Sequence, residues 1–413
     1  MSERLVIDRL GAQGDGIAHS PRGQVYVPFA LAGETVNVAL EKDRATLIAV
    51  IEASPDRVEP ACRHFGECGG CALQHLEQEA YRRWKRDKVA HLLSSRGMDA
   101  PVDELVACPP HSRRRAAFTA RRTEAGMLLG YNRAQSNQII DIEECPILLP
   151  EIVAALPRLR ALAELVCMTK SSFRLTVTAT DTGLDVAAEG SGRLEGAARR
   201  AAADHAARLG FDRLSVDGEI VIEPRKPQIA VGTASIVPPP GGFLQAVADT
   251  EQAMADLIRR HFGKAKRVAD LFSGAGAFAL RLAESAAVHA VEGDAAALAA
   301  LDRGFRFGTG LRRVTSERRD LFRRPLTFKE LNAFDAVVFD PPRAGAEDQA
   351  RQIARSDVPA VCAVSCNPVT LARDLAVLLE GGYRLERVVP FDQFLWSPHV
   401  EAVALLSKPK KRR

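Results

Sequence analysis

No apolar run in the 413-residue sequence approaches the roughly 18 residues that a membrane-spanning helix needs. The first residues, MSERLVIDRL, carry charged side chains in place of the long apolar core of a secretory signal. The composition is neither that of a disordered chain nor collagen-like, and the sequence has no internal repeat. These absences predict a globular cytoplasmic protein with no membrane partner. We further expect a monomer.

Disulfide bonds are not expected, because thiols stay reduced in the cytosol. The eight cysteines are therefore interpreted as metal ligands, catalytic groups or core side chains. Three of them, Cys108, Cys167 and Cys362, lie in no metal-ligand or catalytic motif and are expected to pack in the core.

Net positive charge is scarce, since the formal charge is only +4 and gives little support for nucleic-acid binding by itself. The charge is nevertheless concentrated in two places. The chain ends in KPKKRR, and one acid, Glu124, accompanies six arginines, namely Arg113, Arg114, Arg115, Arg121, Arg122 and Arg133. Such clusters are suited to phosphate contacts, although a solvated surface explains each cluster alone equally well.

The length predicts two or three domains at about 150 residues each, and the patterns distinguish three in a multidomain α/β protein. Residues 1–58 contain short β-branched runs broken by Gly, Asp and Pro, which predicts a small β-barrel of the oligonucleotide-binding type. Residues 59–240 combine a cysteine-rich segment, a charged helix and several strands, so an α+β domain is expected. In residues 241–413 short apolar strands alternate with helical segments, which predicts a doubly wound, Rossmann-like α/β domain.

The segment VADLFSGAGAFAL has the pattern of a strand, a glycine-rich turn and the start of a helix. Gly274 and Gly276 permit a tight turn and close approach of a ligand to the backbone. Glu292 ends the next predicted strand, where a carboxylate can bind ribose hydroxyls. Both NAD and S-adenosylmethionine (SAM) fit this pattern.

Two further carboxylates favour SAM over NAD. Asp270 ends the first strand beside the loop, and Asp340 ends another strand in FDPPR. Carboxylates suit a cationic sulfonium and would repel a pyrophosphate. Arg343 nearby weakens this argument without reversing it.

A thiol and a carboxylate are expected at the same edge of the sheet. Cys366, in SCNP, follows a predicted strand, and Glu401, in HVEAVALL, precedes one. A free cysteine is more often a buried apolar side chain. A thiolate beside SAM, however, can add to carbon 6 of uracil and make carbon 5 nucleophilic. A base must then remove the proton from carbon 5, and Cys366 and Glu401 are the chemical types for these two tasks.

These motifs together resemble the RNA 5-methyluridine methyltransferases, specifically the iron–sulfur branch with an N-terminal TRAM domain that modifies ribosomal RNA. SCNPVTLARDL, FDPPRAG and HVE carry the resemblance in the C-terminal part, and GDGIAH and VPFALAGE carry it in the TRAM-like barrel. The resemblance implies that Cys366 is the nucleophile and Glu401 the base, with 23S rRNA as the partner. It also implies SAM contacts at Gln245, Phe272, Ala277, Glu292 and Asp340.

The chain departs from the family pattern at two places. Ala277 stands where the family often has Asn, so a contact there would be through the backbone. The segment FLWSPHVE has Leu395 and Ser397 where the family has Pro and Thr, so the loop before Glu401 is expected to sit slightly differently. His399, in the same segment, is interpreted as a structural residue that positions this loop.

Four cysteines have the spacing of a metal site. Cys62, Cys68 and Cys71 follow the pattern C-x5-C-x2-C, and a proline comes directly after Cys145. Four thiolates suit an iron–sulfur cluster or an all-cysteine zinc site. The first spacing is longer than is usual for zinc, which favours iron–sulfur, and the family resemblance implies a 4Fe–4S cluster. We interpret its role as structural, with redox sensing as an alternative.

The expected function is thus methylation of carbon 5 of a uridine in RNA, with the barrel and the arginine cluster holding phosphates. Exchange of Arg113, Arg114 and Arg115 is expected to weaken RNA binding without changing SAM affinity. One alternative is the same chemistry on a tRNA uridine or on cytosine. The other is a non-catalytic iron–sulfur RNA-binding protein, against which the presence of Cys366 and Glu401 argues.

Overall fold

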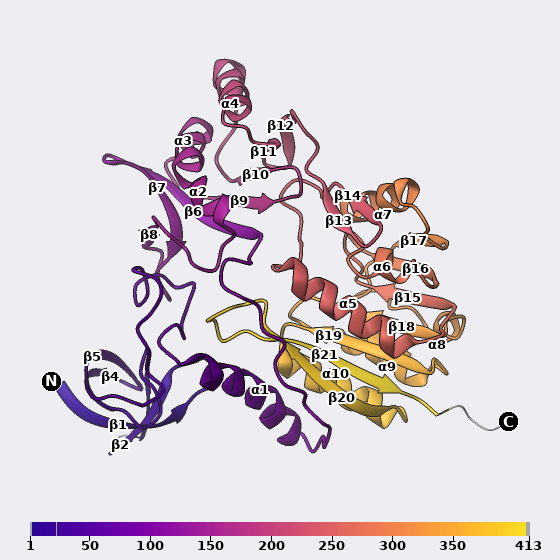
Figure 1. Ribbon diagram of the computed structural model, residues 1–413, viewed down its shortest axis with the longest axis horizontal. Helices are drawn as coiled ribbons and strands as arrows, with labels where there is room; N and C mark the ends of the chain where they lie inside the picture. Colours follow the sequence, from indigo (N-terminus) through magenta and orange to yellow (C-terminus); the bar gives the residue numbers. More distant parts are fainter. Residues whose placement is uncertain (1, 22, 410–413) are drawn as a thin grey trace.

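The computed structural model describes residues 2–21 and 23–409, so most of the basic C-terminal tail lies outside the described residues. Figure 1 shows a small barrel near the N-terminus, a sheet above it and a larger helix-covered sheet on the right. Across the described ranges, no helix combines the length and apolarity that a membrane span requires.

The N-terminal barrel is closed and has five strands in the order β1-β2-β3-β5-β4. Alternate apolar side chains, such as Ile7, Val25 and Val38, are buried inside it. This confirms the small barrel expected from the sequence, because a period of two in the strands places one face inside. Its strands are Ser2–Leu10 (β1), Gly16–Ser20 (β2), Gly23–Val27 (β3), Thr35–Glu41 (β4) and Arg44–Glu52 (β5).

A seven-stranded sheet with the order β12-β11-β10-β9-β6-β7-β8 forms the middle of the molecule. Phe118 and Leu175 of the sheet share its core with Leu159 of the covering helix α3. The strands are Arg115–Thr123 (β6), Gly126–Asn132 (β7), Ile139–Asp141 (β8), Phe173–Ala179 (β9), Leu184–Glu189 (β10), Arg213–Val216 (β11) and Glu219–Ile222 (β12). The helices are Pro150–Ala154 (α2), Leu156–Val166 (α3) and Gly196–Arg208 (α4).

The C-terminal sheet has the order β17-β16-β15-β18-β19-β21-β20, with β21 antiparallel to both of its neighbours. The strand order reverses between β15 and β18, where open α/β sheets bind ligands. This confirms the doubly wound architecture. The strands are Arg267–Leu271 (β15), Ala287–Glu292 (β16), Val314–Arg318 (β17), Ala336–Phe339 (β18), Ala360–Ser365 (β19), Arg384–Phe391 (β20) and Glu401–Ser407 (β21).

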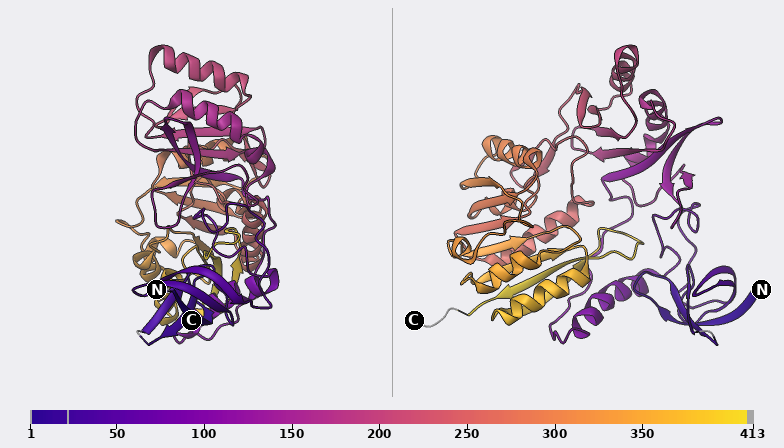
Figure 2. Two further views of the ribbon diagram at one scale, coloured as in Figure 1. Left: turned by 90° about the vertical axis from the view of Figure 1, so that its left-hand side faces the viewer. Right: turned by 180° about the vertical axis from the view of Figure 1, so that it is seen from behind.

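Helices cover both faces of this sheet, as the two views in Figure 2 show. A short hairpin, Ile229–Val231 (β13) and Ala234–Ile236 (β14), packs on α7. The helices are Ala248–Phe262 (α5), Ala279–Leu282 (α6), Ala295–Phe307 (α7), Phe328–Leu331 (α8), Glu347–Arg355 (α9) and Pro368–Glu380 (α10).

Helix α1 (Gln78–Ser94) links the barrel to the C-terminal sheet and anchors the loop that precedes β21. The buried Lys85 donates from Nζ to Asp392 Oδ1 (2.7 Å) and to the Phe394 carbonyl (3.0 Å). The Tyr81 hydroxyl donates to Asp392 Oδ2 (2.8 Å) and accepts from the Trp396 backbone N–H (2.8 Å). The loop that leads to Glu401 is therefore held by residues about 300 positions earlier in the chain.

A buried ion triad joins the middle and C-terminal sheets and corrects the interpretation of Arg114 as a phosphate contact. Arg114 Nη2 donates to Glu251 Oε2 and Arg281 Nη1 donates to Glu251 Oε1, both at 2.7 Å. Arg114 is 6% exposed, and its Nε donates to the Gln245 carbonyl. The Arg114 guanidinium is buried and paired with Glu251, so it is not accessible to an RNA phosphate.

We expect Arg114→Met to lower the free energy of unfolding by about 3 kcal/mol, because it leaves Glu251 buried with one of its two partners. Denaturant unfolding measures this change. Arg121→Met is the matched control, since Arg121 is exposed on β6 and its exchange is expected to cost less than about 0.5 kcal/mol. Equal stability of the two variants would contradict a structural role for Arg114.

Candidate active site

A cavity of about 730 Å³ lies at the carboxyl edge of the C-terminal sheet. Its walls come mainly from the loops after β15, β16, β17, β18 and β19 and from the segments before α5 and β21. The β13–β14 hairpin and the start of β6 complete them. The structure brings together in this cavity all seven residues expected to bind cofactor or perform chemistry, namely Gln245, Phe272, Ala277, Glu292, Asp340, Cys366 and Glu401.

The turn after β15 has the backbone geometry that its glycines predict. Gly274 and Gly276 have φ of +54° and +97°, and a Cβ at Gly276 would lie 3.0 Å from the Leu301 side chain. Phe272 adopts φ of +62°, a conformation that is costly for a bulky residue and is typical of ligand-binding sites. Glu292 Oε2 accepts the Gly274 N–H (3.0 Å), so the carboxylate expected at the ribose also holds the turn.

Ala277, which stands where the family often has Asn, offers a ligand no side-chain hydrogen-bonding group. Ala277 lines the cavity, but its carbonyl oxygen accepts a hydrogen bond from Arg281 (2.7 Å). The methyl group of Ala277 cannot replace the hydrogen bonds that an asparagine side chain would make.

Three carboxylates make this edge electrostatically unusual. Burial, followed by repulsion from Asp340, raises the pKa of both Asp270 and Glu401 well above the usual range. Burial is also the main cause that raises the pKa of Asp340. Asp270 is buried and does not line the cavity; neither of its oxygens is within hydrogen-bond geometry of a partner among the described residues, although the nearby Ala279 backbone N–H partly opposes the rise of its pKa. A cationic ligand would relieve this repulsion.

Cys366 follows β19 and is half-buried in the cavity wall. Burial, and next the negative charges of Glu401 and Asp340, raise the pKa of its thiol to about 11, while Arg343 opposes the shift by its charge and a hydrogen bond. Arg343 Nη2 lies 3.2 Å from His399 Nε2. Since a guanidinium can only donate, His399 accepts at Nε2, and burial lowers the pKa of His399 to about 4. A neutral His399 thus orients Arg343 toward Cys366.

Gln393 was not identified from the sequence, yet it is 2% exposed and lines the cavity. Its Nε2 lies 2.7 Å from Glu401 Oε2 and 2.7 Å from Gln245 Oε1. Gln245 Nε2 in turn donates to Asp340 Oδ2 (3.0 Å). No motif surrounds Gln393, and its position two residues after β20 was the only available sequence signal.

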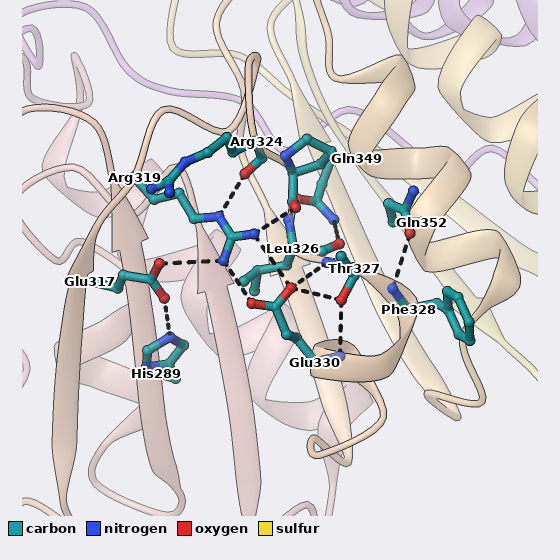
Figure 3. Close-up of polar contacts among 11 residues, drawn as sticks. His289, Glu317, Arg319, Arg324, Leu326, Thr327, Phe328, Glu330, Gln349 and Gln352 are labelled. Atoms are coloured by element: carbon teal, nitrogen blue, oxygen red, sulfur yellow. Dashed lines mark hydrogen bonds and ion pairs between the residues drawn. The ribbon is translucent and has the colours of Figure 1, made fainter.

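The far end of the cavity also contains residues that sequence reasoning missed. Asp320 and Phe322 line it, and the Phe322 ring lies 5.4 Å from that of Phe272. Their position after the third parallel strand of the sheet could have identified them. Figure 3 shows the network that holds this loop, in which Arg319 donates to Glu317, Glu330 and the Arg324 carbonyl. The Arg319 hydrogen bond, chiefly, lowers the pKa of Glu330 to about 2.

The remaining arginines of the cluster separate into two groups. Arg113 and Arg115 line the cavity, and Arg115 Nη2 donates to the Gly241 carbonyl (3.1 Å). Arg121, Arg122 and Arg133 are exposed on or beside the β6–β7 hairpin. Replacing Arg113, Arg114 and Arg115 together would therefore disturb both the cavity and the buried ion triad. This corrects the expectation that the triple variant would lose RNA binding without any change in SAM affinity.

A second cavity of about 280 Å³ is lined by all four outlying cysteines, Cys62, Cys68, Cys71 and Cys145. Burial raises the pKa of Cys71 to about 12 and that of Cys145 to about 11, with smaller contributions from the other thiols. Within the described part of the chain, however, no group of three or more His, Cys, Asp or Glu residues is arranged to hold a metal ion. The two cavities share Arg113, Arg343 and Phe394 as wall residues.

The other three cysteines lie where the sequence predicts. Cys108, Cys167 and Cys362 are buried in three separate hydrophobic clusters. None of them lines either cavity.

Comparison with known proteins identifies relatives along the whole chain. Residues 310–409 match the family model described as tRNA (Uracil-5-)-methyltransferase. An RNA methyltransferase of Mesorhizobium japonicum is 65% identical over the full length of both chains. The 23S rRNA (uracil(1939)-C(5))-methyltransferase of Chromohalobacter salexigens is 34% identical over 100% of this chain and 90% of its own length.

A solved structure has the same overall fold. The tRNA (uracil-54, C5)-methyltransferase of Pyrococcus abyssi, in complex with S-adenosyl-L-homocysteine, superposes with a TM-score of 0.75. It covers 98% of this chain and 100% of its own, with 24% sequence identity. At this identity the likeness establishes the fold alone.

Proposed function

This chain belongs to the family of RNA uracil-5 methyltransferases and is an RNA methyltransferase. On that premise, we propose that it methylates carbon 5 of a uridine in 23S rRNA with SAM as the methyl donor. One observation carries the proposal. A thiol (Cys366) and a carboxylate with one unpartnered oxygen (Glu401 Oε1) face the same cavity as a carboxylate-lined glycine turn. Methyl transfer to nitrogen or oxygen would require no such thiol.

The reaction begins when the target uridine leaves its stack and enters the cavity. The Cys366 thiolate adds to carbon 6, forming a C–S bond and shifting the electron pair toward carbon 5 and the carbonyl oxygen at carbon 4. When bound, SAM supplies the methyl group to carbon 5. Glu401 then removes the proton from carbon 5, the carbon 5–carbon 6 double bond re-forms, and the C–S bond breaks to release the thiolate.

The groups around Cys366 explain how a thiol of high pKa can react. Arg343 is the cation beside it, held by the neutral His399. Glu401 and Asp340 oppose ionisation of the thiol because they are negative. Binding of a cationic donor near Asp340 would neutralise part of this charge and favour the thiolate.

The residues present fit a SAM molecule. Carboxylates at strand ends suit its cationic groups, and Glu292, the last residue of β16, lies at the position for ribose hydroxyls. Phe272 and Phe322 offer aromatic faces, and Asp320 offers a carboxylate beside them. We assign the adenosine to this end of the cavity, which lies away from Cys366 along the sheet edge.

The choice of ribosomal RNA rests on the full-length relative that acts on 23S rRNA, and tRNA is the second candidate because of the matching family model. The test is mass analysis of nucleosides after incubation of the enzyme and SAM with unmodified 23S rRNA or with unmodified tRNA. A gain of 5-methyluridine in rRNA alone supports the proposal. A gain in tRNA alone, or of 5-methylcytidine, would overturn it.

RNA binding is expected to depend on exposed arginines and less on the barrel. Residues 1–58 contain eight acidic and six basic side chains, so the barrel carries no excess positive charge. Arg121, Arg122 and Arg133 are exposed and could contact phosphates, although Arg122 donates to the Glu164 carbonyl and Arg133 lies 3.9 Å from Glu67 Oε2. A monomeric, cytoplasmic enzyme stays a prediction.

We further propose that Cys62, Cys68, Cys71 and Cys145 hold a 4Fe–4S cluster. The donor type fits, since four thiols line one cavity, and neighbouring thiols contribute to the raised pKa of both Cys71 and Cys145. Among the described residues, no three of these side chains are arranged around a single metal ion. Zinc would require four sulfurs at about 2.3 Å from a single ion, whereas a cubane cluster binds each thiolate to a different iron. The cluster would join the cysteine-rich segment to the loop before α2, because Cys145 lies there.

Protein purified without oxygen is expected to contain about four iron atoms per chain and to absorb visible light, whereas Cys145→Ser loses most of both. Iron, sulfide and zinc analysis measures the result. Cys167→Ala is the control, because Cys167 is buried in the middle sheet and lines neither cavity. Stoichiometric zinc in place of iron would contradict the cluster.

A further inference from the structure

The buried amide of Gln393 connects the two carboxylates of the active site through a continuous set of hydrogen bonds. Gln393 Oε1 accepts the backbone N–H of Ala246 (3.0 Å), which determines the orientation of the amide. Its Nε2 therefore faces Glu401 Oε2 and Gln245 Oε1 as a donor to both, each at 2.7 Å. An amide nitrogen has two hydrogens, so both bonds can form at once.

The orientation of Gln393 determines that of Gln245 as well. Because Gln245 Oε1 accepts from Gln393, Gln245 Nε2 is directed to Asp340 Oδ2, 3.0 Å away. We call the series Glu401–Gln393–Gln245–Asp340 the amide bridge. All four side chains line the cavity. In the amide bridge, Gln393 donates to Glu401 and to Gln245, and Gln245 donates to Asp340, so each carboxylate accepts a hydrogen bond.

The amide bridge makes the two oxygens of Glu401 different. Oε2 is anchored by Gln393, whereas Oε1 is buried and has no hydrogen-bond partner in the described part of the chain. A buried oxygen without a partner is energetically costly, and it is expected where a proton has to be accepted.

We propose that Gln393 is a positioning residue of the methylation reaction, which anchors one oxygen of Glu401 so that the other can take the proton from carbon 5. This inference rests on the proposed function and adds a residue to it. In the step concerned, the C–H electron pair forms the carbon 5–carbon 6 double bond, the C–S electrons return to Cys366, and the proton goes to Glu401 Oε1.

The electrostatic surroundings make this anchor necessary. The charged and titratable groups that face Glu401 are Asp340 and Arg343, after β18, and Cys366, after β19. Burial and Asp340 raise the pKa of Glu401, whereas the Gln393 hydrogen bond and Arg343 lower it. Removing the Gln393 donor raises the pKa further. The base then stays protonated up to a higher pH, so the acidic limb of the pH–rate profile moves upward.

The test uses Gln393→Leu, which keeps a similar side-chain volume and removes every hydrogen bond. On whichever RNA the wild type methylates, kcat is expected to fall on the order of tenfold or more, since general base catalysis contributes about 10²–10⁴-fold and only its alignment is lost. The acidic limb of kcat shifts to higher pH. Covalent RNA–protein complexes accumulate on denaturing gels, because addition of Cys366 continues while release is slow.

Controls separate positioning from stability. Gln393→Met tests whether the result depends on the shape of leucine, and thermal unfolding checks that both variants fold. Gln352→Leu is the matched control, because Gln352 Oε1 accepts the Phe328 N–H (3.1 Å) and Gln352 does not line the cavity (Figure 3). It is expected to leave the pH profile and the adduct level unchanged.

The outcomes distinguish this inference from the proposed function. Wild-type enzyme that methylates no RNA at uracil carbon 5 would overturn the function and the inference with it. An active wild type combined with a Gln393→Leu variant of lower kcat, an unshifted pH profile and no accumulated adduct would overturn the inference alone. A shifted acidic limb with accumulated adduct supports it.

Discussion

Replacing Cys366 with alanine is expected to abolish methylation, with a loss of more than about 10³-fold, because no other group in the cavity can add to carbon 6 of uracil. The cavity walls otherwise contain carboxylates, amides, arginines, aromatic and aliphatic side chains, and the Ser273 hydroxyl, which is a much weaker nucleophile than a thiolate. Cys366 is the one cysteine among the described lining residues. The measurement is SAM-dependent release of tritium from carbon 5 of uracil in unmodified 23S rRNA, by protein purified without oxygen.

The matched control is Cys362→Ala, because Cys362 lies on β19, the strand that immediately precedes Cys366, and is buried among apolar side chains. It is expected to lower stability slightly and to retain tritium release. Retained release by Cys366→Ala would exclude a covalent mechanism at this residue. Absence of release by the wild type from rRNA, tRNA and whole-cell RNA would overturn the proposal that carbon 5 of uracil is the target.

The reactivity of Cys366 is expected to rise steeply with pH in the absence of substrate. Its pKa is raised to about 11, by burial first and by Glu401 second. The thiol is therefore protonated at neutral pH, and the thiolate fraction increases about tenfold per pH unit up to the pKa. The rate of alkylation by iodoacetamide, measured at Cys366 by peptide mass analysis, reports this dependence. A plateau near pH 7 would show that Arg343 outweighs the carboxylates.

The second large effect is expected for Glu401→Gln, which retains the size of the side chain and cannot take a proton. Turnover should fall by about 10²–10⁴-fold, while addition of Cys366 and methyl transfer still occur. Methylated RNA then remains bonded to Cys366. With SAM labelled in the methyl group, one label per enzyme is expected in a band that contains both RNA and protein on a denaturing gel.

The double variant Cys366→Ala with Glu401→Gln provides the control, because it cannot form the bond and should give no such band. Full turnover by Glu401→Gln would show that another group removes the proton. The nearest alternative is Asp340, which is coupled to Glu401 through the amide bridge and shares its raised pKa.

The barrel and the doubly wound sheet could be predicted because each depends on local periodicity. Alternation of apolar residues with period two and the change to strand–helix alternation near residue 241 are properties of short segments. The meeting of Glu292, Asp340 and Cys366 was also predictable, because each was expected at the end of a parallel strand and such ends share one edge of a sheet. Gln245 and Phe272 were expected there only because of the family resemblance.

The roles of Arg114 and Asp270 could not be predicted in this way. Arg114 lies in a basic run, but its partner Glu251 is 137 residues away in the chain. The two side chains form an ion pair only because the middle and C-terminal domains pack together. Asp270 lies one residue before the end of β15, close to where it was expected, yet its buried side chain is not part of the cavity wall. A sequence shows which charges exist, but their exposure depends on what packs over them.

The sequence by itself determined the classes of the elements, the cofactor turn and the chemical types at the catalytic edge, because these follow from spacing and residue identity. Only the tertiary structure decided which oxygen of Glu401 is anchored, that Gln393 provides the anchor, and that α1 holds the loop before β21. Hydrogen bonds extend only about 3 Å. Whether two side chains distant in the chain come within that distance depends on the packing of the whole molecule, and no short motif contains that information.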